Sequence, residues 1–584
     1  MRLPYLSELG RQQQSSLSMR GLNLTGTVGN GEWSWTQNTD TRLAPMTRRR
    51  EKRIRVGQLG TPNGLCALNA LCFVDGSSLY YNGYRYSDAL EDSRKTMVPM
   101  GSDIVIFPDR KIFSTVTLQM RDMDARNETT GTVTVTLARP DGTAYTGYTA
   151  SATAPENPEH GDLWLDLNES PAVMKSWSNY TGMWVDEYTT CVAVQATGIG
   201  AGLKADDAVE VSGLEQADLN GTWQLLMAED NRIVFNGMVT AQQTQTAAVT
   251  VKREAPEMDF VIEHNNRLWG CSSESHEIYA CALGDATNWR RYLGISTDSY
   301  AVTVGTPGPF TGAAVVNSCV CFFKENCIHK IYGTMPANFQ MTVDHYRGVE
   351  NGSGQSLVRV NERVFYKSVF DVCCYDGTEV QGVSQALGLG PWRNAVSGAN
   401  DRRLYISMQD GEDEWHLLTY DVETGYWMRE DGTHALFFAS HLTETFMLTD
   451  DGGLWALRSG EYARSAHMIG PDFVVEATEE TDAEVPWMLR TGWIGITLPN
   501  NKHIGKIQLM VELEQGAVLT VRVRKDNEDW GNGITYAGND GRRYTLPIWP
   551  RRCDRLMIEL SGTGGMKIIN MSWLIEYGSE YGRE

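Results

Sequence analysis

The sequence predicts an all-β protein organised around a β-propeller. The 584 residues include 57 Gly but only 19 Pro, together with 17 Trp, 24 Tyr and 15 Phe, a composition typical of turn-rich β proteins. A β-branched or aromatic run, a short turn and an apolar–aromatic step recur along the chain. These steps fall at Cys321, Val364, Leu404 and Leu454, which are 43, 40 and 50 residues apart, the length of a four-stranded blade.

The recurring unit predicts about six blades. The six segments that carry it are Leu68–Tyr81, Phe260–Tyr279, Ala313–Tyr332, Leu357–Tyr375, Asp401–Trp427 and Leu436–Leu457. The unit is degenerate, and no WD or kelch signature accompanies it. A series of unrelated hairpins in sandwiches is therefore the alternative architecture.

The spacing of the units divides the chain into five regions. The first two units are separated by a long stretch with its own alternating strands, such as 132–137, which predicts inserted β-modules. An acidic linker at 475–486 precedes a further set of alternating strands, which predicts a C-terminal β-sandwich. The expected regions are an N-terminal arm at 1–64, a first blade at 65–114, the insertion at 115–250, the remaining blades at 251–465 and the sandwich at 466–584.

Composition excludes several functional classes. With 51 Lys and Arg against 73 Asp and Glu, the net charge of −22 argues against a nucleic-acid coat or a protein bound to an anionic membrane. No run of 18 apolar residues predicts a membrane span, and the polar start does not resemble a signal peptide. The eleven cysteines include no C-x-x-C pair, so we expect buried thiols in a reducing compartment, with a zinc site as the weaker alternative.

No motif in the sequence points to catalysis. The chain has no G-x-S-x-G elbow, H-E-x-x-H, P-loop or dinucleotide fingerprint, and Thr449–Trp455 only partly matches the turns of sialidase-type propellers. Nothing singles out a carboxylate pair among the 73 acids. We therefore expect no enzyme, and no catalytic, cofactor-binding or metal-ligating residue. His329 is expected to be an outward strand residue rather than a ligand.

One basic run stands out against the acidic background. Its cationic residues are Arg48, Arg49, Arg50, Lys52, Arg53 and Arg55. Such a run could contact nucleic-acid phosphates. In an acidic chain we favour a contact between subunits, in which these cations meet acidic neighbours.

A stretch in the second unit carries a family resemblance. Asn265-Asn266-Arg267-Leu268-Trp269, followed by Ile278-Tyr279 and Leu283-Gly284-Asp285-Ala286-Thr287-Asn288-Trp289, resembles the N-x-R-L-W … L-G-D-P-x-N-W stretch of bacteriophage tail proteins. Ala286 stands where Pro is usual, and Cys281 stands where Ser is common. The opening Arg20–Leu24 is similar to the G-L-N start of the same proteins. The chain thus resembles the tail nozzle (tail tubular B, or hub) family of short-tailed phages.

The resemblance implies a structural virion protein that folds in the bacterial cytoplasm and is built into the tail. Such proteins form a ring, usually a homohexamer, below the portal and adaptor proteins. They dock tail fibres and surround a channel through which the genome DNA passes without specific binding. No membrane is involved, and the family carries no catalytic residues to transfer. A net negative lumen would repel phosphates and ease passage of DNA.

A receptor-binding or fibre-associated tail protein is the alternative. In that case Trp164, Trp184 and Trp223 of the insertion would serve as sugar-stacking platforms. The simpler interpretation is that these side chains form the cores of small β-modules.

Overall fold

The computed structural model of the protein is all-β, and its helices are four short 3-10 turns among the residues described. These turns are η1 (Ala217–Leu219), η2 (Pro336–Asn338), η3 (Gly354–Ser356) and η4 (Gln385–Leu387). No helix in the described ranges is long and apolar enough to cross a membrane. The residues described are 11–16, 19–41, 46–187, 190–400, 402–441, 444–457, 484–496, 502–539, 543–545 and 552–577. Most of the expected acidic linker at 475–486 lies outside these ranges.

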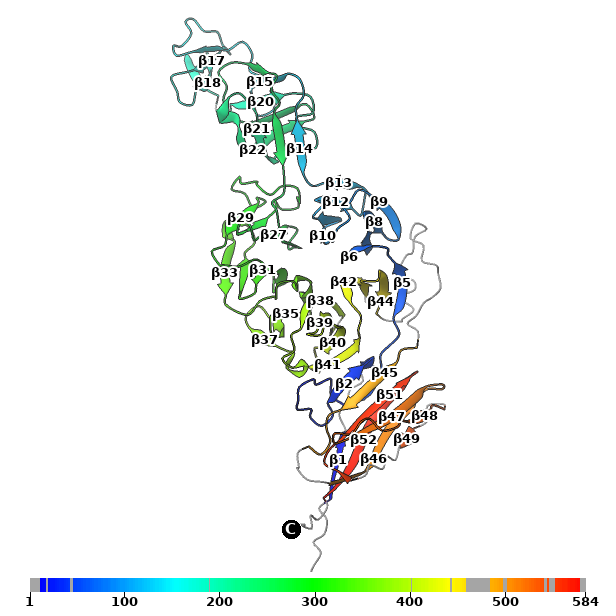
Figure 1. Ribbon diagram of the computed structural model, residues 1–584. Helices are drawn as coiled ribbons and strands as arrows, with labels where there is room; N and C mark the ends of the chain where they lie inside the picture. Colours follow the sequence, from blue (N-terminus) through cyan, green and yellow to red (C-terminus); the bar gives the residue numbers. More distant parts are fainter. Residues whose placement is uncertain are drawn as a thin grey trace, which may run out of the picture. The chain divides into compact units, whose positions relative to one another are not determined.

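Seven four-stranded sheets of the described residues have the strand order of propeller blades, which confirms the fold class (Figure 1). Two of them are β6 (Pro62–Leu68), β7 (Ala70–Asp75), β8 (Ser78–Tyr81), β9 (Tyr84–Ser87), and β10 (Thr96–Met100), β11 (Asp103–Phe107), β12 (Lys111–Ser114), β13 (Met120–Asp122). Two more are β26 (Phe260–Glu263), β27 (Leu268–Ser272), β28 (Glu277–Ala280), β29 (Tyr300–Thr303), and β30 (Gly312–Val316), β31 (Cys319–Lys324), β32 (Cys327–Tyr332), β33 (Gln340–Asp344).

The remaining three sheets follow in the second half of the chain. Their strands are β34 (Val358–Val360), β35 (Arg363–Lys367), β36 (Val372–Tyr375), β37 (Val380–Gly382); β38 (Arg393–Asn400), β39 (Arg403–Gln409), β40 (Trp415–Asp421), β41 (Tyr426–Asp431); and β42 (Ala435–His441), β43 (Glu444–Thr449), β44 (Gly453–Ala456) with β5 (Ile54–Gln58). The last sheet is completed by β5 from the start of the chain. A strand distant in sequence thus closes the final blade.

The count of seven differs from the six expected because the stretch taken as one blade, 65–114, holds parts of two sheets. The strand β11 reads Asp-Ile-Val-Ile-Phe and is followed by a turn at Pro108. A three-residue turn and the apolar–aromatic step Ile112-Phe113 follow it, as in the recurring unit. The pattern is therefore present in this sheet but is not counted among the six expected blades, and the strand buries its aliphatic side chains completely at Ile104, Val105 and Ile106.

The chain divides into two compact units, each with blades that pack face to face. One unit comprises Met1–Lys95, Gly308–Lys330 and Thr342–Glu584, and the other comprises Thr96–Pro307 and Ile331–Met341. In the first unit, a shared core joins the β42–β44–β5 sheet to the β6–β9 sheet. In the second, another core joins β10–β13 to β26–β29. Burial of apolar side chains between neighbouring sheets is what stabilises blades against each other.

The inserted region forms a module of the second unit, from Ala125 to Arg253. Its eight-stranded sheet consists, in spatial order, of β14 (Ala125–Glu128), β25 (Thr250–Arg253), β21 (Ala208–Ser212), β22 (Gly221–Glu229), β23 (Arg232–Asn236), β20 (Cys191–Gln195), β15 (Val133–Ala138) and β24 (Gln243–Gln245). A smaller sheet has β16 (Thr149–Ser151), β17 (Leu163–Asp166), β18 (Val173–Ser178) and β19 (Met183–Asp186). Leu165 and Met174 of this smaller sheet are buried in the core that the larger sheet forms.

The C-terminal domain is a two-sheet sandwich, and the N-terminal arm is part of it (Figure 1). One sheet has β3 (Thr39–Asp40), β4 (Thr47–Arg49), β52 (Met566–Tyr577), β46 (Lys502–Leu513) and β49 (Arg543–Thr545), with β1 (Arg11–Ser16) on β52 and β50 (Arg552–Cys553) on β46. The other has β2 (Trp33–Gln37), β45 (Trp487–Thr491), β51 (Leu556–Thr563), β47 (Val518–Lys525) and β48 (Ile534–Ala537). The expected arm at 1–64 thus supplies four sandwich strands, the blade strand β5 and the first residues of β6.

Candidate functional site

The basic run lies where the arm meets the blade formed by β38–β41. Arg53 is 4% exposed, and its guanidinium lies 2.7 Å from the carboxylate of Glu430 and 2.9 Å from that of Asp431. Arg50 is also buried and reaches Asp431 at 3.4 Å. The acidic partners of these two arginines belong to the same chain. Their expected contact with a second subunit or with DNA stays a prediction.

The arm is held at this position by further charge pairs. Burial opposes ionisation of Asp431, but Arg53 and Arg50 outweigh it and lower its pKa to about 2. Arg403 of β39 forms a buried ion pair with Asp40 of β3. These pairs link the arm to two strands of one blade, so Arg50 and Arg53 form part of a structural joint.

The remaining cations of the run are more exposed. Arg48 lies 3.8 Å from Asp40 and 3.2 Å from Glu51, and Arg55 lies over the ring of Trp455. Arg49 and Lys52 are half-buried. A contact of these four with a neighbouring subunit or with DNA stays a prediction.

The opening stretch that resembles phage tail proteins packs against the same blade. The amide of Leu22 donates a hydrogen bond of 2.6 Å to the carbonyl of Trp427 in β41, and Leu22 is buried in the core of this blade. A Cβ on Gly21 would lie 2.4 Å from that carbonyl oxygen. Glycine is therefore required here by the close approach of two backbones.

The second resembling stretch, Asn265–Trp289, builds the β26–β29 blade and its connections. Asn265 and Asn266 take positive φ angles of 52° and 57° in the turn between β26 and β27. Arg267 is 3% exposed, and its guanidinium donates to the carbonyls of Cys281, Ser296 and Asp298. One planar fork thereby satisfies three loop carbonyls, which a lysine could not do in this geometry.

The second half of the stretch forms a buried turn. Trp289 is 2% exposed, and its indole N–H donates to the carbonyl of Ala286 at 2.8 Å. Asp285 accepts hydrogen bonds from the amide and the hydroxyl of Thr287. Cys281 accepts from the amide of Leu268, and burial raises the pKa of its thiol to about 12, so the thiol stays neutral. The turn therefore forms with Ala286 in place of proline and Cys281 in place of serine.

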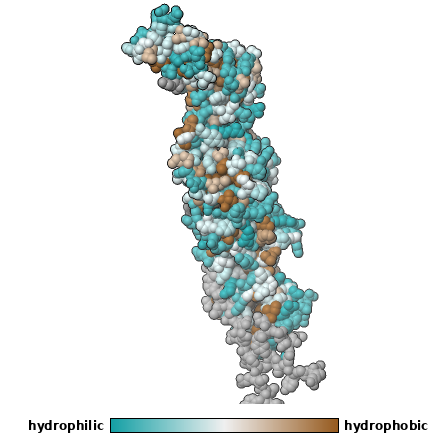
Figure 2. All heavy atoms as spheres, turned by 90° about the vertical axis from the view of Figure 1, so that its left-hand side faces the viewer, coloured by the Kyte–Doolittle hydropathy of each residue, from teal (hydrophilic) through white to brown (hydrophobic). Residues whose placement is uncertain are grey.

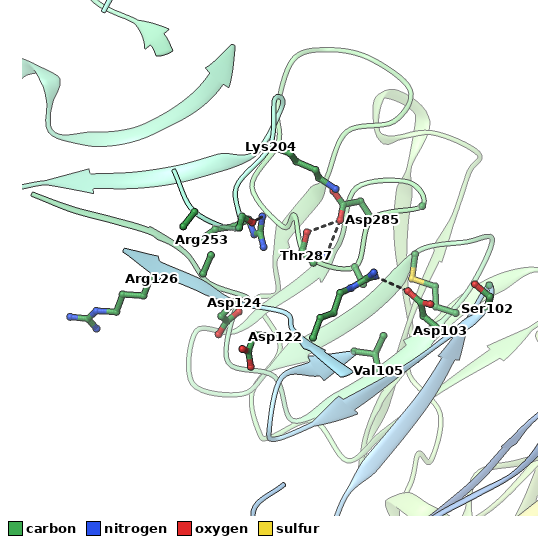
Figure 3. Close-up of a pocket in the computed structure, with 18 of the residues that line it drawn as sticks. Ser102, Asp103, Val105, Asp122, Asp124, Arg126, Lys204, Arg253, Asp285 and Thr287 are labelled. Atoms are coloured by element: carbon green, nitrogen blue, oxygen red, sulfur yellow. Dashed lines mark hydrogen bonds and ion pairs between the residues drawn. The ribbon is translucent and has the colours of Figure 1, made fainter. Parts of the chain in front are cut away.

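This turn also contacts the inserted module. Lys204 of the module reaches Asp285 at 2.8 Å (Figure 3). Asn288 donates to the carbonyl of Asp206 at 2.8 Å. Burial opposes ionisation of Asp285, but the Lys204 and Thr287 hydrogen bonds outweigh it and lower its pKa. The resembling stretch thus helps to attach the insertion to its blade.

A polar cleft of about 880 Å³ lies at this attachment. Its walls include the turn at Gly284–Thr287, the ends of the β10–β13 strands and the base of the module (Figure 3). Several of its charged side chains are paired: Arg121 lies 2.7 Å from Asp103, and Arg253 forms a buried pair with Asp207 outside the lining. No group of three or more His, Cys, Asp or Glu in the described ranges is placed to hold a metal ion.

The tryptophans of the insertion divide into two groups. Trp223 stacks on Phe235 at 5.2 Å, and its indole N–H donates to the carbonyl of Leu219, so it belongs to the module core. Trp164 and Trp184 pack edge to face at 5.4 Å on the small sheet, and Lys175 lies over the Trp164 ring. The sugar-stacking role of these two stays a prediction.

Two other sequence expectations meet different outcomes. His329 is fully buried beside Phe310, so the expectation of an outward side chain is wrong, and burial lowers its pKa to about 4. All eleven cysteines are free thiols, and all but the half-buried Cys319 are buried. The burial of these ten agrees with their expected role as small apolar residues.

Sequence reasoning missed Asp298, the residue that organises the connection before β29. This side chain is 4% exposed, and its Oδ2 accepts the amides of Leu293 and Gly294 at 2.6 Å and that of Ile295 at 3.1 Å. A sequence signal exists in the Gly-x-Ser-Thr-Asp order, where Gly294 precedes an acid that can cap the turn. It is too common a pattern to single out one position.

Comparison with known proteins identifies no family. No family profile matches the chain, and no curated protein matches it. Among solved structures, the computationally designed Ika8 protein is 10% identical, with 69% of this chain and 99% of that chain covered and a TM-score of 0.32. Raptor from Chaetomium thermophilum is 10% identical over 70% of this chain and 29% of its own, with a TM-score of 0.28. BamB from Moraxella catarrhalis is 8% identical over 62% and 92%, with a TM-score of 0.22. These likenesses are too distant to bear on function.

Proposed function

We propose that the chain is a structural protein of a bacteriophage tail, which forms a ring of nozzle or hub type below the portal and adaptor and extends the DNA channel. The observation that carries the proposal is the Asn265–Trp289 stretch, which resembles that family. Its residues act as scaffold: Arg267 binds three carbonyls, Trp289 is buried, and Asp285 pairs with the inserted module. Such roles suit a structural protein, since none of them exposes a reactive group.

The charge of the chain supports a conduit. At a net charge of −22, a ring of several copies carries a large excess of acidic groups. Acidic walls repel phosphates over roughly a Debye length, about 8 Å at physiological salt, and so prevent tight retention of DNA. The two buried arginines of the basic run agree with this idea, because their charge is already neutralised by Glu430 and Asp431.

The architecture offers surfaces for assembly. In this proposal the inserted module, with its own core and its paired attachment at Lys204–Asp285, docks a tail fibre or another tail protein. Insertions that fold around a separate core can vary without disturbing the blades that carry them. The ring would also cover sheet edges that are otherwise open to uncontrolled pairing.

Electron microscopy of the purified full-length chain tests the proposal. We expect closed rings, six copies in the family resembled, with a central channel wide enough for duplex DNA. A chain that stays monomeric at micromolar concentration, or that forms fibres, contradicts the nozzle. Antibody labelling of phage tails distinguishes the alternative: label at the tail axis supports the nozzle, and label at the fibre tips supports a receptor-binding protein.

A gel-shift titration with random-sequence duplex DNA tests the conduit separately. We expect no retention at physiological salt, since non-specific binding needs clustered, unpaired cations. Micromolar binding with a steep salt dependence would show that the chain holds DNA rather than letting it pass.

A further inference from the structure

The loop at 290–297 exposes a cluster of large apolar side chains. Tyr292 is 57% exposed, Leu293 51% and Ile295 47%. Leu283, 43% exposed, lies beside them, because its amide donates to the carbonyl of Thr297. Figure 2 shows brown, hydrophobic side chains set among teal ones on the face of the molecule that carries β29. Exposed apolar clusters of this kind mark interaction sites, since water disfavours them.

The loop is held in its conformation by hydrogen bonds within the chain. The carboxylate of Asp298 accepts three consecutive amides, from Leu293 to Ile295. The amide of Ser299 donates to the carbonyl of Arg291 at 2.9 Å and closes the loop at its base. A loop ordered in advance loses little conformational entropy on binding, so its apolar area contributes to affinity.

Residues of the Asn265–Trp289 stretch form hydrogen bonds that fix the base of this loop. Arg267 donates to the carbonyls of Ser296 and Asp298, and the hydroxyl of Ser299 donates to the carbonyl of Asn288. The loop therefore packs on buried residues of the motif, Arg267 and Asn288. Because the motif anchors an exposed apolar tip, we infer that one role of the motif is to present this tip to a partner.

The chemistry of the tip favours a protein partner of acidic character. Tyrosine and arginine are enriched at the centres of protein interfaces, and exposed aliphatic side chains beside them gain from burial there. The Arg290 side chain is 51% exposed, and its pair with Glu210, at 3.9 Å and half-exposed, is worth little in water. A surface of net negative charge complements the Arg290 side chain. A second copy of this chain, whose net charge is −22, provides such a surface.

We propose that the 290–297 loop is one half of the contact between neighbouring copies in the ring, with its apolar tip inserted into the next chain. This inference rests on the proposed function, because it assigns the subunit interface of that ring. The contact is heterologous: the loop of each copy meets a different surface of the next, as a closed ring requires.

The test compares two triple variants of the full-length chain by mass photometry and electron microscopy. One is Tyr292→Ser/Leu293→Ser/Ile295→Ser. The matched control is Tyr180→Ser/Met183→Ser/Val185→Ser, which removes apolar side chains that are 91%, 64% and 46% exposed in the inserted module. We expect the loop variant to raise the concentration needed for ring formation by about 30-fold or more, as the loss of interface anchors does. The control should assemble like the wild type.

The outcomes separate this inference from the proposed function. A wild-type chain that forms no ring overturns the function, and the inference with it. Rings from wild type and loop variant alike overturn the inference only. Loss of rings in both variants also overturns it, because general surface apolarity would then drive assembly.

A photo-crosslinking amino acid gives a readout that does not depend on serine variants folding. Placed at Leu293 in the purified chain, it should form chain-to-chain adducts on irradiation, whereas placed at Tyr180 it should not. Assembled rings without adducts from position 293 contradict the proposed contact.

Discussion

Replacing Arg53 by methionine should destabilise the joint between the N-terminal arm and its blade. The change keeps the length of the side chain but removes the ion pairs at 2.7 Å to Glu430 and 2.9 Å to Asp431. Glu430 is 5% exposed, so its carboxylate would be left in a site where water cannot reach it readily. Removing one partner of a buried pair costs about 3–5 kcal/mol. Arg50 remains 3.8 Å from Glu430, which places our estimate at about 3 kcal/mol, the lower end of that range.

Urea denaturation at pH 7, followed by tryptophan fluorescence, measures the loss, and hydrogen exchange at β5 locates it. Arg85→Met is the matched control: its side chain is 52% exposed and pairs with Asp88 at 3.5 Å, so its loss should cost below about 1 kcal/mol. Adding Glu430→Gln to Arg53→Met should recover part of the cost, because no unpaired carboxylate remains. If Arg53→Met costs no more than Arg85→Met, the idea of a buried joint is refuted.

Three further predictions follow from individual sites. The folded-state pKa of Asp431 is lowered to about 2, so its contribution to stability is complete above the ordinary carboxyl pKa and is lost as pH falls toward 2. The difference in unfolding free energy between wild type and Asp431→Asn should therefore narrow over that pH range, and a constant difference would contradict the prediction. The pKa of buried His329 is lowered to about 4, so the free energy of unfolding should fall as pH drops from 6.5 toward 4, by about 1.4 kcal/mol per pH unit at most. Denaturation curves of His329→Asn should show a smaller pH dependence over this range. An unchanged pH dependence would mean that other groups cause it. Gly21→Ala places a Cβ 2.4 Å from the Trp427 carbonyl oxygen and should lower the free energy of unfolding by about 1–3 kcal/mol. Gly26 has open space around it, so Gly26→Ala should leave thermal denaturation nearly unchanged. Equal effects of the two variants would show that the arm shifts to accommodate the added methyl group.

Much of the architecture is readable from local patterns. Alternating apolar residues and turn signals predict the strands, and turns such as Asn265-Asn266 predict hairpins, because these features depend on neighbours in sequence. The motif at Asn265–Trp289 could likewise be recognised as a unit. What it does, however, depends on Ser296, Asp298 and Lys204, whose contacts with it require the folded chain.

The sequence by itself determined an all-β chain with blade-length repeats, an insertion after the first blade and a C-terminal β domain, since periodicity and turn residues act over a few neighbouring positions. Only the tertiary structure decided that β5 closes the last blade, that the arm contributes β1–β4 to the sandwich, and that Arg50 and Arg53 are neutralised inside the chain. These features join segments that lie up to hundreds of residues apart. No local pattern encodes which distant strand edge or which of 73 acids a residue will meet; burial and charge pairing select the partner when the chain folds.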